Sequence, residues 1–395
     1  MADRFRLTIA QLNPTLGDLA GNAAKARDAW EKGKAAGADM VALPEMFIAG
    51  YNAQDLPMKH AFTLDCMAAV KQLAEDCADG PTLAIGCPWV EGTELFNAYV
   101  ICRGGKMVTQ VFKHHLPNYK VFDELRIFDS GPIGGPYAVG NTRVGSPICE
   151  DAWYEDVAET LAETGAEFLL VPNGSPYYRN KYETRLNKMI ARVVETGLPL
   201  IYLNMTGGQD DQIFDGGSFV LNPHGAVAMQ LPVFEEAIAH VDLERTEDGW
   251  RALDGDFTRH PDAMEQDYNA MVVALRDYCR KTGFGKVLLG LSGGIDSALV
   301  ATIAVDALGA ENVRCVMLPS EYTSEHSLED AKACAEALGC HYDFVPITPG
   351  RDAITETLAP LFEGRDPDLT EENIQSRLRG LLLMALSNKF GEMLL

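Results

Sequence analysis

The sequence predicts an α/β protein of two domains, a mixed-sheet domain at residues 1–245 and a parallel-sheet βαβ domain at residues 264–395. Three observations lead to this prediction. The chain has 395 residues, which is more than one hydrophobic core usually accommodates. Short β-rich runs alternate with helical runs in the first part, and hairpin turns interrupt the alternation. Beyond residue 286, single strands alternate with helices, as in parallel βαβ units.

In the first domain, apolar and β-branched runs bounded by turn residues predict seven strand segments. They lie at residues 6–12, 40–46, 82–90, 98–112, 143–149, 168–173 and 200–207. Helical spacing of apolar residues predicts helices at residues 20–36, 60–78, 154–164 and 181–196. The turns Arg103-Gly104-Gly105 and Asn222-Pro223-His224-Gly225 each divide a pair of strands, so the sheet is predicted to be mixed.

Residues 246–263 are polar and contain glycine and proline, so we expect the linker between the domains there. A helix at 264–282 then leads into the second domain. The later elements are predicted in the order strand, helix, strand, helix, strand, helix, at residues 287–291, 298–308, 314–318, 327–338, 343–346 and 371–390. Because only three strands are evident before the chain stops, we expect that it is truncated at its C-terminus.

Composition narrows the class of protein. The chain carries 33 basic and 57 acidic residues, a net charge of -24, which argues against general binding to nucleic acid or anionic membranes. The N-terminus lacks the apolar core of a signal peptide, and no stretch approaches the ~20 apolar residues of a membrane span. Nine cysteines without a CxxC pair argue against a disulfide framework or a structural zinc site. We therefore expect a cytoplasmic protein.

A strand at 287–291 runs into the sequence SGGIDS at 292–297 and then into a helix. Two adjacent glycines allow backbone N–H groups to approach an anion, the helix start adds partial positive charge, and two serines add hydroxyl donors. No lysine follows the glycines, which disfavours a kinase-type phosphate loop. The acidic Asp296 suits a Mg²⁺ that bridges phosphate oxygens. The alternative is a tight strand-to-helix turn without a ligand.

The SGGIDS sequence resembles the pyrophosphate loop of the N-type ATP pyrophosphatases. These Rossmann-like enzymes cleave ATP to AMP and pyrophosphate, and so activate a carboxylate or carbonyl for attack by nitrogen. The resemblance implies that ATP lies along Gly290, Leu291, Ser292, Gly293, Gly294, Ile295, Asp296 and Ser297. It also implies that the rest of the chain supplies nitrogen.

Three residues of the first domain lie where a predicted strand meets a loop: Glu45, Lys113 and Cys149. Two acidic residues follow Cys149 directly and would raise the pKa of its thiol, so a nearby cation is needed. Glu45 as general base, Lys113 as that cation and Cys149 as nucleophile form a complete set for hydrolysing a C–N bond through a thioester. Singly, each residue also has a purely structural explanation.

In this order, Glu, Lys and Cys resemble the catalytic triad of the nitrilase superfamily, over residues 5–243. That resemblance implies a four-layered αββα sandwich and a second carboxylate near the lysine, for which Glu124 is the candidate. With both resemblances taken together, the whole chain is similar to the family of glutamine-dependent NAD⁺ synthetases. They imply that glutamine is held by Tyr119, Glu150, Ser175 and Lys181, with Tyr51 as a wall, and Lys181 replaces an arginine found in other members.

In the second domain the family resemblance implies that Asn373 lies near deamido-NAD⁺, with Arg377 and Arg379 as phosphate neighbours. The alternative for the arginines is the polar face of the last helix. The family's next motif, around TGNKSE, does not occur in this sequence. In the family, this motif completes the ATP and Mg²⁺ sites.

The predicted function is ATP-dependent amidation of deamido-NAD⁺ through an adenylate, by a Mg²⁺-using ligase that takes ammonia from glutamine and forms a homo-oligomer. One alternative is a stand-alone amidase or carbamoylase with a vestigial second domain, and another is a non-catalytic interaction module. Two other glutaminase classes do not fit. One needs cysteine as the second residue, where this chain has Ala2, and the other needs glycines beside the nucleophile, where Cys149 has Ile148 and Glu150.

Overall fold

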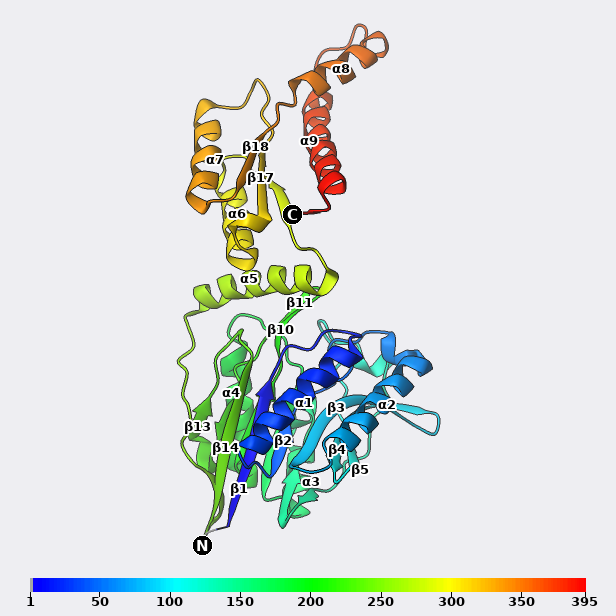
Figure 1. The fold of residues 1–395 in the computed structure, drawn as a ribbon, viewed down its shortest axis with the longest axis vertical. Helices are drawn as coiled ribbons and strands as arrows, with labels where there is room; N and C mark the ends of the chain where they lie inside the picture. Colours follow the sequence, from blue (N-terminus) through cyan, green and yellow to red (C-terminus); the bar gives the residue numbers. More distant parts are fainter. Residues whose placement is uncertain (1–2) are drawn as a thin grey trace. The chain divides into compact units, whose positions relative to one another are not determined.

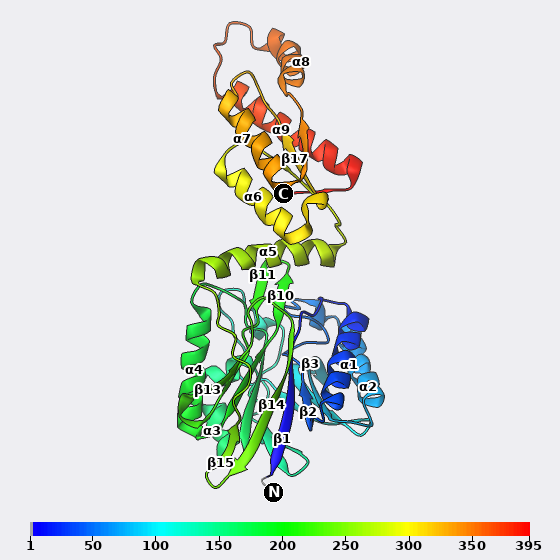
Figure 2. The same cartoon turned by 60° about the vertical axis from the view of Figure 1, so that its left-hand side comes forward.

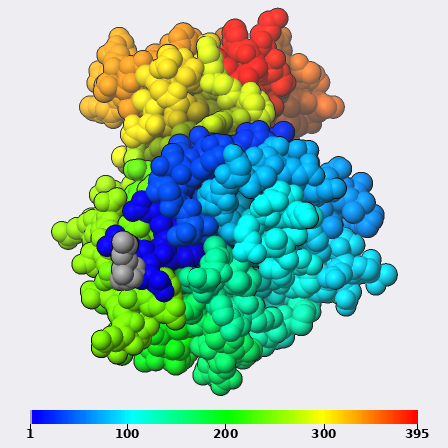
Figure 3. Space-filling model, turned by 60° about the horizontal axis from the view of Figure 1, so that its bottom comes forward, coloured from blue at the N-terminus to red at the C-terminus, as the bar shows by residue number. Residues whose placement is uncertain are grey.

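The computed structural model describes residues 3–395, which divide into two compact units, one ending at Ala270 and one spanning Met271–Leu395. Each unit is described by itself (Figures 1 and 2). The space-filling view in Figure 3 shows one face of each. Both units are α/β, as the sequence predicts. Among the described residues, no helix combines the length and the apolar character needed to cross a bilayer.

Two sheets form the centre of the first unit. The seven-stranded sheet has the order β15-β14-β1-β2-β3-β4-β5, with bounds Gly249–Ala252, Ala237–Thr246, Arg4–Gln11, Met40–Ala42, Thr82–Glu91, Glu94–Arg103 and Lys106–Phe112. The six-stranded sheet has the order β13-β12-β9-β8-β7-β6, with bounds Val227–Gln230, Phe219–Leu221, Leu200–Asn204, Phe168–Asn173, Thr142–Gly145 and Tyr137–Val139. Strands β10 (Thr206–Gln209) and β11 (Gln212–Asp215) form a separate hairpin. Both sheets contain parallel and antiparallel pairs, which confirms the predicted mixed topology.

Helices cover the outer face of each sheet (Figure 2). Helices α1 (Leu19–Ala35) and α2 (His60–Asp76) pack on the seven-stranded sheet, and α3 (Glu155–Glu163) and α4 (Lys181–Thr196) pack on the other. Successive side chains of a strand point to opposite faces. In β8, Phe168 and Leu170 therefore enter the core between the sheets, while Leu169 and Val171 meet the helices. Burial on both faces explains why the strands are continuously apolar, and it produces the four layers αββα.

The predicted helices of this unit are confirmed to within two residues, and so are the two hairpins. Differences occur at strand ends. Strand β2 covers only Met40–Ala42 of the predicted 40–46, because the chain leaves the sheet before Glu45. The expected strand 143–149 ends at Gly145, since Cys149–Trp153 is a 3-10 helix. Strand β15 lies inside the segment 246–263, expected as linker, and pairs with β14.

The second unit has a four-stranded sheet in the order β18-β17-β16-β19, and every adjacent pair is parallel. The strands are His341–Phe344, Val313–Met317, Val287–Gly290 and Met393–Leu394. Helices α6 (Ile295–Leu308), α7 (Glu325–Leu338), α8 (Thr348–Leu358) and α9 (Leu369–Phe390) connect them, and α5 (Ala263–Thr282) precedes them. The predicted βαβ order is confirmed, and the sequence prediction missed α8 and the two-residue β19.

Candidate active site

Glu45 lies in a loop held tightly against strand β3 of the first unit. A Cβ on Gly86 would lie 2.0 Å from the Met46 nitrogen, so only glycine permits this approach of two backbones. The loop places the Glu45 carboxylate in a fully buried position. Its Oε1 accepts hydrogen bonds from Asn97 Nδ2 at 2.8 Å and Lys113 Nζ at 2.7 Å. Its Oε2 accepts one from the Gly174 N–H at 2.7 Å, which fixes the carboxylate plane.

Lys113 follows strand β5 directly and is also fully buried. Its ammonium lies 2.7 Å from Glu45 Oε1 and 2.8 Å from Glu124 Oε2. Tyr51 OH donates to the other Glu124 oxygen at 2.7 Å. Burial lowers the pKa of the Lys113 ammonium, but Glu124 and Glu45 outweigh it and raise that pKa well above its usual range. Lys113 is therefore a fixed positive charge held between two buried carboxyl groups.

Cys149 is the first residue of the 3-10 helix and is buried. Its φ of +48° is unusual for a residue with a side chain, and such backbone conformations concentrate at functional sites. Burial, followed by the charge of Glu45, raises the pKa of the thiol well above its usual range, while Lys113 acts in the opposite direction. The resting group is therefore a neutral thiol that interacts electrostatically with both a carboxylate and an ammonium.

The residues expected to bind glutamine gather near Cys149. Tyr119 OH donates to Glu150 Oε2 at 2.9 Å, and Glu150 is buried. Lys181 begins helix α4, and its Nζ lies 4.3 Å from the centre of the Trp153 ring. Burial, and then Arg185, lower the pKa of Lys181 to about 8. Lys181 interacts electrostatically with Cys149 and Glu150, so a cation and an anion flank the thiol.

Ser175 lies in the turn after strand β8, where several polar groups hold it. Its N–H donates to Asn204 Oδ1 at 2.9 Å, and its hydroxyl accepts from Arg185 Nε at 3.1 Å. Arg185 is fully buried and also lies 2.8 Å from Asp215 Oδ2. Because arginine only donates, the Ser175 hydroxyl keeps its own hydrogen for another acceptor.

Sequence reasoning did not identify Asn97, Gly174 or the pair of Arg185 and Asp215. Asn97 is in mid-strand, where a polar residue between buried neighbours is the only signal. Gly174 supplies a backbone donor, and a Cβ there would lie 2.5 Å from the Tyr51 ring. Arg185 lies only four residues after Lys181, but no role was predicted for it, because its importance follows from its burial in the fold.

In the second unit, the loop after β16 folds around its own serines. Ser297 Oγ accepts from the Ser292 N–H at 3.2 Å, and its hydroxyl donates to the Gly294 carbonyl at 2.9 Å. Gly293 has φ +83°, and a Cβ there would lie 2.3 Å from the Ser327 carbonyl oxygen at the start of α7. The glycine is therefore required both by its backbone conformation and by the close approach of α7.

A cavity of about 330 Å³ opens beside this loop. Its lining includes Gly290, Leu291 and Ser292 of the predicted ATP segment, together with strand β17 residues and Arg379. Arg379 Nε donates to the Leu318 carbonyl at 3.0 Å, which holds the guanidinium at the wall. Asp296 is exposed in the first turn of α6. Neither Asn373, Arg377 nor Asp296 belongs to the residues lining this cavity.

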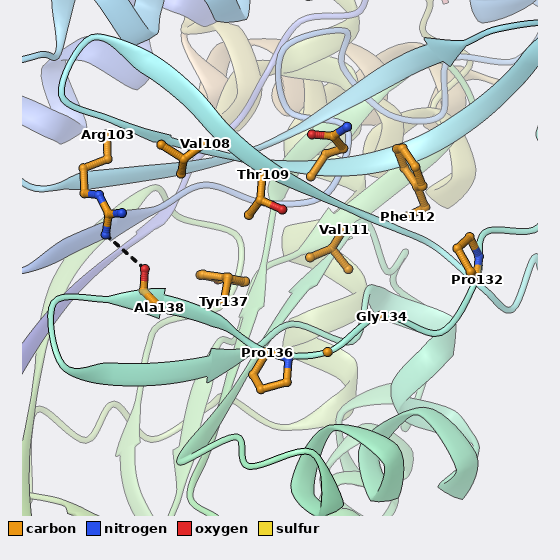
Figure 4. A pocket seen from close by; sticks show the side chains of 12 residues that line it. Arg103, Val108, Thr109, Val111, Phe112, Pro132, Gly134, Pro136, Tyr137 and Ala138 are labelled. Carbon is orange, nitrogen blue, oxygen red and sulfur yellow. Dashed lines mark hydrogen bonds between the residues drawn. The ribbon is translucent and has the colours of Figure 1, made fainter.

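A second cavity, in the first unit, lies away from the catalytic candidates. Its volume is about 510 Å³, and it opens between strand β5 and the segment that leads into β6 (Figure 4). Strands β5 and β6 are edge strands of the two sheets. Arg103 NH1 reaches across it to the Ala138 carbonyl at 3.1 Å. Its lining contains neither Glu45, Lys113 nor Cys149, so it does not belong to the site at Cys149.

Comparisons with known proteins agree with both halves of this arrangement. Residues 6–251 match the carbon-nitrogen hydrolase family, and residues 267–395 match the NAD synthase family. An amidase structure from Nesterenkonia sp. is 24% identical, with TM-score 0.55 over 61% of this chain and 90% of that one, which shows the shared fold of the first unit.

Full-length relatives contain both parts. A glutamine-dependent NAD(+) synthetase of Rhodobacter capsulatus is 60% identical over 100% of this chain and 72% of that protein. The structure of glutamine-dependent NAD+ synthetase from Acinetobacter baumannii in complex with ADP is 36% identical, with TM-score 0.94 over 99% of this chain and 74% of that one. Two matched domains and this identity place the chain in the family of glutamine-dependent NAD⁺ synthetases.

Proposed function

We propose how the residues of the chain divide the work of an enzyme that uses glutamine to make NAD⁺. The first unit hydrolyses glutamine to glutamate and ammonia at Cys149. The second unit uses ATP to activate the nicotinate carboxylate of deamido-NAD⁺, which ammonia then converts to the amide. The observation that carries the proposal is the fully buried Lys113. It is held between Glu45 and Glu124, and its charge acts on the pKa of the Cys149 thiol.

In the proposed glutaminase reaction, Glu45 accepts the thiol proton as Cys149 Sγ attacks the side-chain amide carbon of glutamine. Lys113 stabilises the negative charge that develops on the oxygen. Glu45 then returns the proton to the leaving nitrogen, and ammonia departs from a thioester. A water molecule that gives its proton to Glu45 then attacks the thioester carbon, the C–S bond breaks to release glutamate, and Glu45 returns the proton to Cys149 Sγ. The neutral resting thiol and the adjacent carboxylate favour this concerted order over a preformed thiolate.

Glutamine itself carries an ammonium and a carboxylate, and the site offers a partner for each. We assign the ammonium to Glu150, which Tyr119 already orients at 2.9 Å, and the carboxylate to Lys181 and the Ser175 hydroxyl. Tyr51, packed between Gly174 and Glu124, forms a wall of the site. Arg185 is a positioning residue, since it acts through Ser175.

In the second unit, we assign ATP to the segment Gly290–Ser297 and the adjoining cavity. The ADP complex of the relative from Acinetobacter baumannii supports a nucleotide site in this family. The exposed carboxylate of Asp296, next to the phosphate loop, fits Mg²⁺, because this ion is typically held by one or two carboxylates together with phosphate oxygens. Mg²⁺ would neutralise phosphate charge there. Asn373 on α9, which is not among the residues that line the cavity, is assigned to deamido-NAD⁺.

We also propose the domain bounds, the cellular location and the oligomeric state of the enzyme. We place the glutaminase domain at 1–245 and the synthetase domain at 264–395, in keeping with the matched families. All nine cysteines are free, as suits a reducing cytoplasm. We also propose a homo-oligomer. Sedimentation velocity of the purified chain tests this state.

The test of the catalytic assignment replaces Lys113 by Met and Glu45 by Gln, in separate variants. Glutamate release from glutamine should fall by at least about 10²-fold in each, because one loses oxyanion stabilisation and the other the proton carrier. NAD⁺ formation from added ammonia should stay unchanged, which shows that the second unit is intact. Glutaminase activity retained by either variant would refute its assigned role.

A further inference from the structure

His114, His115 and Asp156 form a cluster beside the catalytic residues that the proposed reaction does not use. One potential ligand atom from each lies within 4.8 Å of the others, and across residues 3–395 no other group of three histidine, cysteine or acidic side chains meets this condition. We propose that this cluster binds a divalent transition metal of the zinc class. Two imidazoles and one carboxylate are a donor set that zinc accepts, with a fourth position left for water.

The hydrogen bonds of His114 prepare its ring for a metal. Nδ1 of His114 lies 2.7 Å from the Gly131 carbonyl oxygen, which can only accept, so Nδ1 carries the hydrogen. The other nitrogen, Nε2, therefore holds a free lone pair. Metal-binding histidines are usually arranged in this way, with the second ring nitrogen donating to a carbonyl or carboxylate.

His115 and Asp156 are already at nearly the spacing that a metal requires. His115 Nε2 lies 2.8 Å and 3.0 Å from the two carboxylate oxygens of Asp156. Bonds of about 2.0–2.1 Å in tetrahedral geometry place neighbouring ligand atoms about 3.3 Å apart. An ion that replaces the proton between these atoms needs them to separate by only a few tenths of an ångström.

The backbone that presents the two histidines is fixed before any metal arrives. The buried carboxylate of Asp151 accepts the N–H of His114 at 3.0 Å and the N–H of His115 at 2.7 Å, both through Oδ1. Its other oxygen accepts the Ile148 N–H at 3.0 Å. Since three backbone donors converge on one buried side chain, binding would not have to order this segment, which favours affinity.

The cluster lies near the proposed glutamine site and is partly open to solvent. The side chains of His115 and Asp156 are 25% and 47% exposed. The Tyr154 ring packs on His115 with 4.3 Å between ring centres, and Tyr154 interacts electrostatically with Tyr119. A bound metal would connect the segment that follows Lys113 to helix α3, which follows Cys149, and would brace the two segments against each other.

The experiment is a titration of metal-free, tag-free protein with Co²⁺, whose visible absorption reports four-coordinate nitrogen and oxygen ligands. We expect one Co²⁺ per chain, displaced by Zn²⁺, and a Zn²⁺-dependent rise in Tm through linkage of binding to folding. His115→Ala and Asp156→Asn should each weaken binding by at least about 10-fold. Circular dichroism identifies any variant that fails to fold, and Asp156→Asn preserves shape if His115→Ala does not.

The matched control is His341→Ala. His341 Nε2 lies 3.0 Å from Asp343 Oδ1, so it forms a similar exposed pair, but Arg314 occupies that carboxylate and no third ligand joins it among the described residues. Its loss should leave Co²⁺ binding unchanged. The proposal fails if wild-type protein binds no more Co²⁺ than His115→Ala does. It also fails if thiolate-type absorption shows that cysteine binds the ion. It also fails if His341→Ala weakens binding as much as His115→Ala.

Discussion

At the residue scale, buried charges determine what the site at Cys149 can do. Lys113 lies between two carboxylates, and all three side chains are buried, so each charge acts strongly on its neighbours. Burial raises the pKa of Glu124 to about 7, and the nearby ammonium of Lys113 opposes that rise. The same environment keeps the pKa of the Cys149 thiol high. In the proposed reaction, proton transfer from the thiol to Glu45 would therefore accompany the attack on bound substrate.

The pKa of Lys181 indicates how glutamine use should depend on pH. Its pKa is lowered to about 8, so the neutral amine replaces the cation as pH rises through that value. At pH 9 the neutral form is in about tenfold excess. The kcat/KM for glutamine should fall accordingly, because the substrate carboxylate loses its partner.

Lys181→Arg provides the control for this pH dependence. Its guanidinium stays charged, so the fall in kcat/KM should move to higher pH, where only the ammonium of glutamine itself titrates. Steady-state kinetics between pH 7 and 10 on both proteins measure the difference. Identical profiles for the two would show that Lys181 does not bind the carboxylate.

We expect the buried ion pair of Arg185 and Asp215 to contribute to the free energy of unfolding. Both side chains are 1% exposed, with 2.8 Å between Arg185 NH1 and Asp215 Oδ2. Asp215→Asn leaves a buried cation without its counter-charge and should lower the free energy of unfolding by about 3–5 kcal/mol. Urea unfolding of the glutaminase unit measures this loss.

A control pair of the same chemistry lies at the surface. Arg6 and Asp242 are 40% exposed and 2.6 Å apart, so Asp242→Asn should cost about 1 kcal/mol or less. Equal losses for the two variants would contradict the importance of burial. If only Asp215→Asn loses stability, we also expect that variant to bind glutamine more weakly, because Arg185 orients Ser175.

At the element scale, both candidate sites lie where strands end. Glu45, Lys113 and Cys149 follow β2, β5 and β7, which belong to two facing sheets, so their meeting requires the sandwich to be assembled. The phosphate loop follows a single strand and depends on one local conformation. A substitution in that loop should therefore affect the second unit only.

Gly293→Ala tests the loop. Its φ is +83°, and the added Cβ would lie 2.3 Å from the Ser327 carbonyl, so the loop must move and ammonia-dependent NAD⁺ formation should fall about tenfold or more. Glutaminase activity should remain. Gly283→Ala is the control, because Gly283 has φ +84° with no atom within 4 Å of an added Cβ. Loss of synthesis in both variants would mean that backbone strain alone, and not the packing of the loop on α7, explains the effect.

Sequence patterns predicted the elements better than their ends. Apolar runs and turn residues located most strands and helices, because burial on both faces of a strand leaves a clear apolar signal. The end of β2 and the 3-10 helix at Cys149 were missed, since tertiary contacts of loop backbone determine both. Residues that act through burial, such as Asn97 and Arg185, have no local pattern. Glu45, Lys113 and Cys149 could be proposed from the sequence because they lie at predicted strand ends and resemble the residues of a known family.

At the scale of the whole molecule, two units with different folds occur on one chain, and each holds half of the proposed reaction. The sandwich buries the Cys149 thiol, while the parallel sheet presents the proposed phosphate loop at the end of β16. Despite the net charge of -24, cationic side chains occur in both sites: Lys113 lies between Glu45 and Glu124, Arg185 pairs with Asp215, and Arg379 lines the cavity of the second unit. The account therefore predicts that the two half-reactions are separable by substitution.

The most direct test is NAD⁺ formation from deamido-NAD⁺ and Mg-ATP, fed with either glutamine or ammonia, by the wild-type protein and by Cys149→Ala. The account predicts that the wild type uses both nitrogen sources and that Cys149→Ala uses ammonia alone, at an unchanged rate. Glutamine-dependent synthesis by Cys149→Ala would contradict the assigned nucleophile. Failure of the wild type with both nitrogen sources, while it still hydrolyses glutamine, would contradict the role assigned to the second unit.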